Sequence, residues 1–597
     1  MDAIRDAWKA RIARVLEHLL AETGATGHIE PSQVIAEIPP KPEMGDLGFP
    51  MFSFAKLFKK APNQISQMVC MRLAEIDALM TANNTPDIVA PATFTAEGPY
   101  VNLRLDRPSV TAAVLAQMAD ETAPVGRPGT LSASRIMVEF SSPNTNKPLH
   151  LGHLRNDILG ESISRILAAC GATVRKVCII NDRGIHICKS MLAYKEQGGG
   201  RTPESEHTKS DHFVGDYYVK YHQMSQTDTG AETRAQEMLR KWEAGDTETV
   251  DLWQKMKDWT VNGMKETYKR TDISFDQYYY ESQTYLLGKD EVYKGLEKGL
   301  FYRESDGAVA VDLSAEKLDK KILLRKDGTS IYITQDFGTA IFRHQDWPFD
   351  RMVYVVGSEQ QYHFQVLFAI LKKLGYQWAD NLYHLSYGMV NLPEGKMKSR
   401  EGTVVDADDL IDSLKDLALE EIRSKDREEA VGDSAEVAEK IALGALHYYL
   451  LQVTPAKDML FDPKESLSFN GNTGPYLQYM GARISSILRR ADSITNGKAG
   501  GSVKPELLGS DAEWELVKTI AAYPAAVADA AARMDPSILA AYLYELSKGF
   551  SRFYHDCPIL GAGTPDLAAG RLALAKGVLR VLRDALYLIG IPFLETM

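Results

Sequence analysis

A polar stretch between an apolar run and a periodic helix constrains this chain more than any other feature. The stretch runs from Ser141 to His153 and reads SSPNTNKPLHLGH. The segment 134–140, SRIMVEF, precedes it and has the β-branched, apolar character of a buried strand. Apolar residues then recur at helical spacing from Leu154 to Leu167. The chain therefore turns from a strand into a helix here, and ligands of parallel α/β sheets bind at such strand ends.

Two histidines in this turn are candidates for phosphate contacts. The free N–H groups and the positive dipole end of a helix favour anions. His150 and His153 would add hydrogen bonds to the oxygens of a nucleotide triphosphate, and Gly152 lets a ligand approach closely. Taken alone, the pair is also compatible with a metal site or with an ordinary helix start.

A second polar element lies far downstream, in a basic, glycine-rich loop after the apolar run 385–392. It reads KMKSREG from Lys396 to Gly402. With this loop the chain resembles the class I aminoacyl-tRNA synthetases, because HLGH at 150–153 is similar to their HIGH motif and KMKSR at 396–400 to their KMSKS loop. The longer strings VEFSSPNTNKPLHLGHLRND and GMVNLPEGKMKSREGTVV resemble the arginyl-tRNA synthetases in particular. The resemblance covers nearly the whole chain.

Composition excludes several other classes of protein. The 597 residues and a hydrophobic content of 45% are enough for several cores. No stretch approaches the roughly 18 apolar residues of a membrane helix, and the first residues open a charged amphipathic helix, so we expect a cytoplasmic protein. The five cysteines form no CxxC pair. His186 and Cys188 make only a lone HxC pair, while His207 and His212 are expected in loops, so we predict no metal site.

The formal charge of −12 argues against a uniformly basic surface. RNA phosphates would then have to meet local clusters of Lys and Arg. Each candidate cluster is also compatible with a solvated helix face. The candidates are Lys56, Lys59, Lys60, Arg489, Arg490, Arg580 and Arg583.

The chain divides into three predicted domains. Residues 1–122 are expected to form an α+β module, which resembles the N-terminal tRNA-contacting domain of the family. Residues 123–432 alternate strands and helices in β-α-β order, which predicts a parallel, Rossmann-like sheet with an insertion at about 187–300. Residues 433–597 predict an all-α helical bundle that resembles the anticodon-binding domain. No GxGxxG follows the first strand, which disfavours a dinucleotide-binding oxidoreductase.

Further strands of the catalytic domain are predicted at 308–313, 330–334 and 351–356. Asp336 falls just after the second of these strands. The polar sequence 357–363 follows the third. Both positions are expected at the carboxyl edge of the sheet, where site residues gather.

The resemblance implies a two-step reaction with arginine, ATP and tRNA as substrates. Arginine would attack the α-phosphorus of ATP, and a ribose hydroxyl of the tRNA would then take the arginyl group. A guanidinium needs carboxylate partners, and Glu139 and Asp336 fit this role because a carboxylate buried there without a cation would be costly. The implied arginine contacts are Glu139, Tyr332 and Asp336 on the guanidinium side and Ser142, Asn144 and Gln360 on the amino and carboxylate side. Tyr332 as a core aromatic and Gln360 as a helix cap remain the alternatives.

The resemblance also implies the groups that bind and activate ATP, which would arrive with Mg²⁺. The ATP contacts would be His150, Gly152, His153, Met389, Val390, Lys396 and Met397. One departure from the family pattern is that Ser399 stands where the second lysine of the KMSKS loop is expected. Lys147 or Arg400 would have to supply the missing cation. The predicted catalytic residues are Lys147, His150, Gly152, His153, Lys396, Lys398 and Arg400.

The predicted partner is tRNA(Arg), with Tyr476, Tyr479 and Met597 as candidate contacts through base stacking or packing. The resemblance suggests a monomer. Three alternatives remain open: a class I synthetase for another amino acid such as cysteine or glutamate, a cytidylyltransferase-like enzyme that uses an HxGH motif, and a regulatory RNA-binding protein descended from a synthetase.

Overall fold

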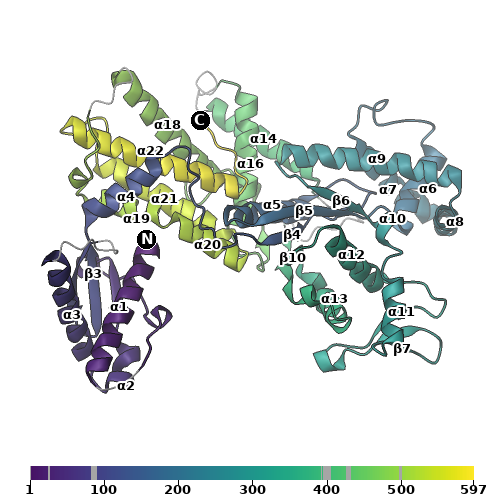
Figure 1. Cartoon of the computed structure of the whole chain (residues 1–597). Helices are drawn as coiled ribbons and strands as arrows, with labels where there is room; N and C mark the ends of the chain where they lie inside the picture. The colour runs from purple at the N-terminus through teal and green to yellow at the C-terminus, as the bar shows by residue number, and fades with distance from the viewer. Residues whose placement is uncertain are drawn as a thin grey trace. The chain divides into compact units, whose positions relative to one another are not determined.

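A sheet of five parallel strands organises the central part of the chain (Figure 1). This computed structural model describes residues 2–23, 27–82, 91–391, 393, 405–424, 432–495 and 501–597. The strands, in the spatial order β11-β10-β4-β5-β6, are β4 (Arg135–Glu139), β5 (Thr173–Ile180), β6 (Gln277–Tyr280), β10 (Arg351–Gly357) and β11 (Leu382–Tyr387). All of these pairings are parallel.

The strand order reverses at β4. Helix α5 (Leu151–Ala169) connects β4 to β5 on one side, whereas β10 pairs with β4 on the other side. A crevice forms at the carboxyl ends of strands where their order reverses, and ligands bind there. The end of β4 and the polar turn that follows it therefore lie at the crevice where a ligand is expected to bind.

Successive side chains along each strand point to opposite faces of the sheet. Met137, Val177 and Met352 share a core with helices α12 (Tyr332–Asp346) and α13 (Gln361–Lys373). Both helices lie below the sheet in Figure 1. Glu139 has the same parity as Met137, so its side chain points toward the face that α12 covers.

Two insertions interrupt the nucleotide-binding fold. The first, between β5 and β6, is helical and has its own apolar core. The second contains a three-stranded antiparallel sheet in the order β7-β8-β9. Their elements are α6 (Ile185–Gln197), α7 (Ser210–Thr227), α8 (Ala231–Glu243), α9 (Thr247–Arg270), α10 (Glu281–Thr284), α11 (Lys289–Glu297), β7 (Tyr302–Arg303), β8 (Val309–Val311) and β9 (Lys321–Leu324).

Two expectations for this region differ from the structure. The strand predicted at 330–334 is wrong, because α12 begins at Tyr332 and Asp336 lies in its first turns. Ile333, Phe337 and Ile341 recur at helical spacing and pack into the core, which outweighs the strand preference of the β-branched residues. Strand β6 was not predicted, because it is short and lies between polar, helical segments.

The chain forms two compact units by contact density, and the first contains a smaller sheet. This unit comprises Met1–Gly126, Ile484–Ala525 and Glu545–Leu582, and the other comprises Arg127–Arg483, Ala526–Tyr544 and Arg583–Met597. In the first unit, an antiparallel sheet in the order β1-β3-β2 packs with α1 and α3 around a common core. The elements before residue 126 are α1 (Asp2–Glu22), β1 (Leu47–Pro50), α2 (Ala55–Phe58), α3 (Pro62–Ala82), β2 (Ala92–Glu97), β3 (Tyr100–Leu105) and α4 (Arg107–Ala119).

Helices dominate the chain after β11. A short parallel pair, β12 (Val390–Asn391) with β13 (Met459–Leu460), is the exception among the described residues. The helices are α14 (Ala407–Ser424), α16 (Ser434–Leu451), α17 (Pro463–Ser466), α18 (Gly474–Thr495), α19 (Asp511–Ala521), α20 (Tyr523–Arg533), α21 (Ser537–Asp556) and α22 (Pro565–Leu588). None of the helices in the described part of the chain has the length and apolar composition needed to cross a membrane. The predicted fold class is confirmed.

Candidate active site

A cavity of about 490 Å³ opens at the point where the strand order reverses. Its walls come from the turn after β4, the start of α5, the ends of β10 and β11, and strand β12. It brings together the predicted residues Ser142, His150, Gly152, His153, Gln360, Met389 and Val390. Segments far apart in the sequence thus form one concave surface, as a nucleotide-binding site of this fold requires.

The turn after β4 has a strained backbone that a buried asparagine holds in place. Ser141 and Ser142 both have positive φ, 72° and 52°, a conformation that costs non-glycine residues about 1–3 kcal/mol each. The Asn156 side chain accepts from the Ser141 N–H and donates to the Val355 carbonyl at 2.7 Å. Ser142 lines the cavity, and its buried hydroxyl has no hydrogen-bond partner among the described residues.

The histidines of the turn cap helix α5 and are fixed in one tautomer. His150 is the N-cap residue, and its Nδ1 accepts from the Gly152 N–H at 3.1 Å. Nδ1 of His153 in turn accepts from the His150 N–H at 3.2 Å. Each ring therefore keeps its proton on Nε2, where it can donate to an anion. The two histidines can therefore cap the start of the helix and also donate hydrogen bonds to a phosphate.

Burial keeps both imidazoles neutral. Desolvation, with the nearby Lys147 charge, lowers the pKa of His150 to about 4 and the pKa of His153 well below its ordinary value. Burial also lowers the pKa of Lys147. Since its ammonium has no hydrogen bond or ion pair with any residue that the structure describes, Lys147 is a cation available beside the histidines.

Glu139 already has a cation partner. Its carboxylate, at the end of β4, pairs with Arg343 of α12, and both residues are buried, with exposures of 6% and 2%. Desolvation raises the pKa of Glu139, while Arg343 opposes the rise. The argument that Glu139 would lack a cation without bound arginine is therefore wrong, although its contact with arginine stays a prediction.

Asp336 differs from Glu139 because no arginine or lysine among the described residues pairs with it. Its Oδ2 lies 2.6 Å from His363 Nε2, and its side chain is 44% exposed. The negative charge of Asp336 adds to the burial that raises the pKa of Glu139. Neither residue belongs to the cavity wall that contains the histidines, but Glu139 precedes the wall residue Ser141 by two positions.

The remaining arginine candidates are accessible. Tyr332, the first residue of α12, is 76% exposed, which excludes the core-aromatic alternative. Gln360 is the N-cap residue of α13, but its side chain makes no capping bond and lines the cavity. Asn144 is exposed and forms an isolated backbone bridge with Asn181, outside the cavity wall.

The lysine loop falls outside the described residues, and so do Lys396, Met397, Lys398 and Arg400. The residues on either side of it are placed. Asn391 lines the cavity, and the Val405 carbonyl accepts from the Leu151 N–H at 3.1 Å. The chain therefore leaves the site at β12 and returns beside the histidine turn.

Family models match three parts of this chain. Residues 6–105 match the arginyl tRNA synthetase N terminal domain, residues 122–462 the catalytic domain of class I tRNA synthetases (R), and residues 477–597 the DALR anticodon binding domain. The chain belongs to the arginyl-tRNA synthetase family.

Relatives in this family match the chain along its whole length. An arginine–tRNA ligase of Treponema denticola is 59% identical over 601 residues, and one of Treponema pallidum is 53% identical over 600 residues, with 100% of both chains covered in each case. The arginyl-tRNA synthetase structure of Thermus thermophilus is 26% identical, covers 99% of this chain and 100% of its own, and gives a TM-score of 0.79.

The candidate tRNA contacts of this arginyl-tRNA synthetase family member differ in exposure. Tyr476 of α18 packs edge-on against Tyr544, with ring centroids 6.0 Å apart. Tyr479 is 37% exposed. Met597 packs beside Leu594 and helix α16. Of the basic candidates, Lys56, Lys59, Lys60, Arg489 and Arg490 are exposed, whereas Arg580 donates to backbone carbonyls and Arg583 pairs with Glu595.

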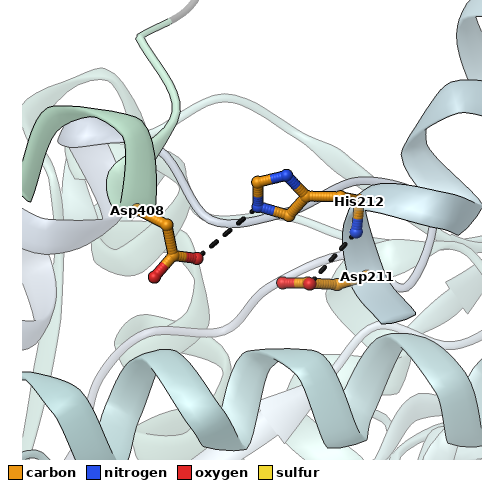
Figure 2. A group of neighbouring side chains, drawn as sticks. All are labelled: Asp211, His212 and Asp408. Carbon is orange, nitrogen blue, oxygen red and sulfur yellow. Dashed lines mark hydrogen bonds and ion pairs between the residues drawn. The ribbon is translucent and has the colours of Figure 1, made fainter. Parts of the chain in front are cut away.

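A second cluster of titratable groups links the first insertion to α14. Figure 2 shows His212 between Asp211 and Asp408, and the potential ligand atoms of the three lie within 4.8 Å of one another. His212 lies on α7 and not in a loop as expected. The Lys209 ammonium bonds both carboxylates, at 3.0 Å to Asp211 and 2.7 Å to Asp408. A lysine thus already supplies the positive charge that a metal would bring.

Sequence reasoning missed several residues of the site. Asn156 and Tyr387 line the cavity and bond each other at 3.1 Å, and Asn391 adds to its polar wall, which also contains Glu359 from the predicted polar sequence 357–363. Arg155 lies directly behind the wall. The available signal was the pair Arg155-Asn156, because two polar residues on a predicted buried helix face need a reason to be there.

Proposed function

We propose that this chain ligates L-arginine to tRNA(Arg) with ATP, through an arginyl-adenylate, and releases AMP and pyrophosphate. One observation carries the proposal: the histidine turn and Ser142 line one cavity at the switch point of a sheet, in a chain that belongs to the arginyl-tRNA synthetase family. A cavity of this kind suits a nucleotide with a small second substrate.

In the first step, the arginine carboxylate attacks the α-phosphorus of ATP and pyrophosphate leaves. His150 and His153 donate Nε2–H hydrogen bonds to phosphate oxygens, whose charge grows in the transition state. Neutral imidazoles suit this role because they donate without competing for a proton at physiological pH. Lys147 supplies a cation near the leaving pyrophosphate, together with Lys396, Lys398 and Arg400 of the loop.

ATP is held by Gly152, Met389, Val390 and Met397 in addition to the histidines. Mg²⁺ accompanies ATP and is coordinated by phosphate oxygens and water. The described wall of the cavity contributes a single carboxylate, Glu359, which supports a metal that arrives with the nucleotide over one held by a cage of protein ligands.

Arginine binds with its guanidinium toward Asp336 and Glu139. Asp336 is the principal partner, because its partly exposed carboxylate pairs with His363 alone among the described residues, whereas Glu139 pairs with the permanently charged Arg343. Tyr332 adds a contact on the guanidinium side. Ser142, Asn144 and Gln360 hold the amino and carboxylate groups at the end nearer the histidines.

The rest of the chain binds tRNA. We assign residues 1–122 to tRNA contact, 123–432 to catalysis with a helical insertion between β5 and β6, and 433–597 to anticodon binding through Tyr476, Tyr479 and Met597. The three matched family models support this division. We further propose a cytoplasmic monomer that contains no resident metal.

The test is the charging of unfractionated tRNA with labelled arginine. We expect acid-precipitable label that requires ATP, tRNA and the enzyme together. Label that appears without tRNA, or no label under conditions in which the relatives' enzymes charge tRNA, would overturn the proposal.

A further inference from the structure

A buried arginine two residues after the histidine motif donates hydrogen bonds to backbone carbonyls, and its guanidinium lies 5.9 Å from the centre of the Tyr387 ring. Arg155 of α5 is 1% exposed. Its Nη1 donates to the Met389 carbonyl at 3.1 Å, and its Nη2 donates to the carbonyls of Pro455 and Lys457 at 3.1 and 2.7 Å. No carboxylate among the described residues accepts a hydrogen bond from it.

Such a guanidinium is expensive to bury, so its geometry needs an explanation. Burial lowers the pKa of Arg155, and the three carbonyls replace water around its N–H groups. These carbonyls belong to two chain segments, 388–389 and 455–457, that approach each other closely. A side chain on Gly388 would meet the Lys457 backbone at 2.4 Å. Arg155 therefore fastens both segments to the helix that carries the histidines.

The first of these segments is a wall of the cavity. Met389, Val390 and Asn391 line it opposite the histidine turn. Besides the hydrogen bond from Arg155, the Met389 carbonyl accepts one from the Met459 N–H at 2.9 Å. The Met389 N–H donates to the Asp458 carboxylate at 2.7 Å. The position of β12 relative to α5 is thus set by bonds that converge on Met389.

The neighbouring residue on the helix completes the arrangement. Asn156 holds the turn after β4 and the end of β10, while Arg155 holds β12. Two consecutive side chains of α5 thereby connect the histidine turn to both flanking walls. The arginine side of the cavity depends on Asn156, and the ATP side depends on Arg155.

We propose that Arg155 is a positioning residue for ATP: through the Met389 carbonyl it holds the β12 wall at the distance from the histidines that the nucleotide requires. This inference rests on the proposed function, because it uses the assignment of Met389 and Val390 to ATP. Arg155 itself touches no substrate.

The variant Arg155→Lys tests whether the forked hydrogen bonds of the guanidinium are required. A lysine ammonium keeps the charge, but it cannot reach three carbonyls of two segments in the planar pattern of a guanidinium. We expect KM for ATP in tRNA-dependent ATP–pyrophosphate exchange to rise about tenfold, and further in Arg155→Met, because a displaced wall misplaces the nucleotide. KM for arginine stays within about twofold, since Asn156 still holds the other wall.

The matched control is Arg165→Lys on the same helix. The Arg165 side chain is 8% exposed and also donates to backbone carbonyls, those of Tyr587 and Asp272, at 2.9 and 2.8 Å, and it pairs in addition with the Glu161 and Asp272 carboxylates. It lies outside the cavity wall. We expect a loss of thermal stability comparable to that of Arg155→Lys, with both KM values unchanged.

A second perturbation keeps the test decisive if the Arg155 variants do not fold. Asp458 is exposed, and Asp458→Ala removes a different bond to Met389, so a smaller rise in KM for ATP alone, about threefold, is expected. Equal changes in both KM values, or lower stability with unchanged KM values, would overturn the inference. Absence of arginine-dependent exchange in the wild-type enzyme would instead overturn the proposed function.

Discussion

The histidine turn and the acidic pair, the two halves of the proposed site, are built in different ways. His150 and His153 are three residues apart, and the bonds that orient them lie within the same helix start. Glu139 and Asp336 come from a strand and a distant helix, and their partners, Arg343 and His363, lie on two helices. The first half is determined locally, whereas the second depends on the packing of the whole sheet.

A substitution in the histidine turn can therefore change the chemistry without changing the stability of the fold. In the acidic pair, the two effects are linked. A histidine of the turn can lose its donor while a shorter side chain preserves the cap. Glu139 cannot be neutralised without leaving Arg343 as an unpaired buried cation. Asp336, which is partly exposed, can be changed at lower cost to the fold.

The largest effect is expected for His153. In His153→Asn the amide oxygen can still accept from the His150 N–H, but the Nε2–H donor is lost, so adenylate formation should fall by about 10²- to 10³-fold. Single-turnover assays measure this change. His153→Ala, the matched control, should lose similar activity and also about 1 kcal/mol of stability, because the cap is lost. Equal activity in His153→Asn and the wild type would contradict the phosphate role.

Lys147→Ala is expected to lower adenylate formation by about 10²-fold, because a cation beside the leaving pyrophosphate is removed. The loss should be at least as large as that of Lys398→Ala, which is the comparison variant. The measurement is the single-turnover rate at saturating ATP. If Lys147 proves dispensable while Lys398 does not, the cation assignment is wrong.

The two acids should respond differently to neutralisation. Asp336→Asn should raise KM for arginine by about 30- to 100-fold, because a charged, forked contact with the guanidinium is lost, with little change in stability. Glu139→Gln should instead lower the free energy of unfolding by about 3 kcal/mol, since Arg343 is left unpaired. Adding Arg343→Met should restore part of that stability. The contrast fails if Glu139→Gln alters only KM for arginine.

The histidine turn should contribute to acid sensitivity without limiting activity. Because the pKa of His150 is lowered to about 4 in the folded chain, the folded form stays neutral while the unfolded form takes up a proton below about pH 6.5. Stability is thus present above pH 6.5 and is lost as the pH falls, by up to about 1.5 kcal/mol between pH 7.5 and 5.5. In urea unfolding experiments, the free energy of unfolding of His150→Asn should change less with pH than that of the wild type. A rate profile that falls at pH 6 in the wild type but not in this variant would contradict a neutral imidazole.

The smallest effect is expected for metal removal. Asp211 and Asp408 pair with Lys209 much as Glu139 pairs with Arg343, so EDTA should shift Tm of the substrate-free protein by less than about 1 °C. Thermal unfolding with and without EDTA is the measurement. A fall in Tm that a divalent metal reverses would show that the cluster in Figure 2 is a metal site.

The local half of the site could be predicted from sequence. A strand, a polar turn and a periodic helix are contiguous in the chain, so the positions of His150, Gly152 and Ser142 at a strand end followed from pattern and from family resemblance. Their tautomer and neutrality did not, because these depend on burial by segments distant in sequence. The burial of the Ser142 hydroxyl without a partner among the described residues, and the positive φ values of Ser141 and Ser142, likewise result from packing.

The non-local half shows what a linear pattern lacks. Residues 330–334, just before Asp336, contain β-branched side chains and were predicted as a strand, but the apolar residues at helical spacing form helix α12 instead. Nothing in the sequence near Glu139 indicates that Arg343 neutralises it. The Arg155 contacts with residues 389, 455 and 457 join parts of the chain that only the fold brings together.

The central claim is that a cationic amino acid is activated by two neutral histidines that line a cavity, while an acidic pair outside the wall of that cavity holds its guanidinium. The most direct measurement is ATP–pyrophosphate exchange with tRNA present and each of the twenty amino acids in turn, in the wild type and in Asp336→Asn. The account predicts exchange with arginine alone, and a higher KM for arginine in the variant. Exchange with cysteine or glutamate at the rate of arginine, or arginine exchange that Asp336→Asn leaves unchanged, would contradict it.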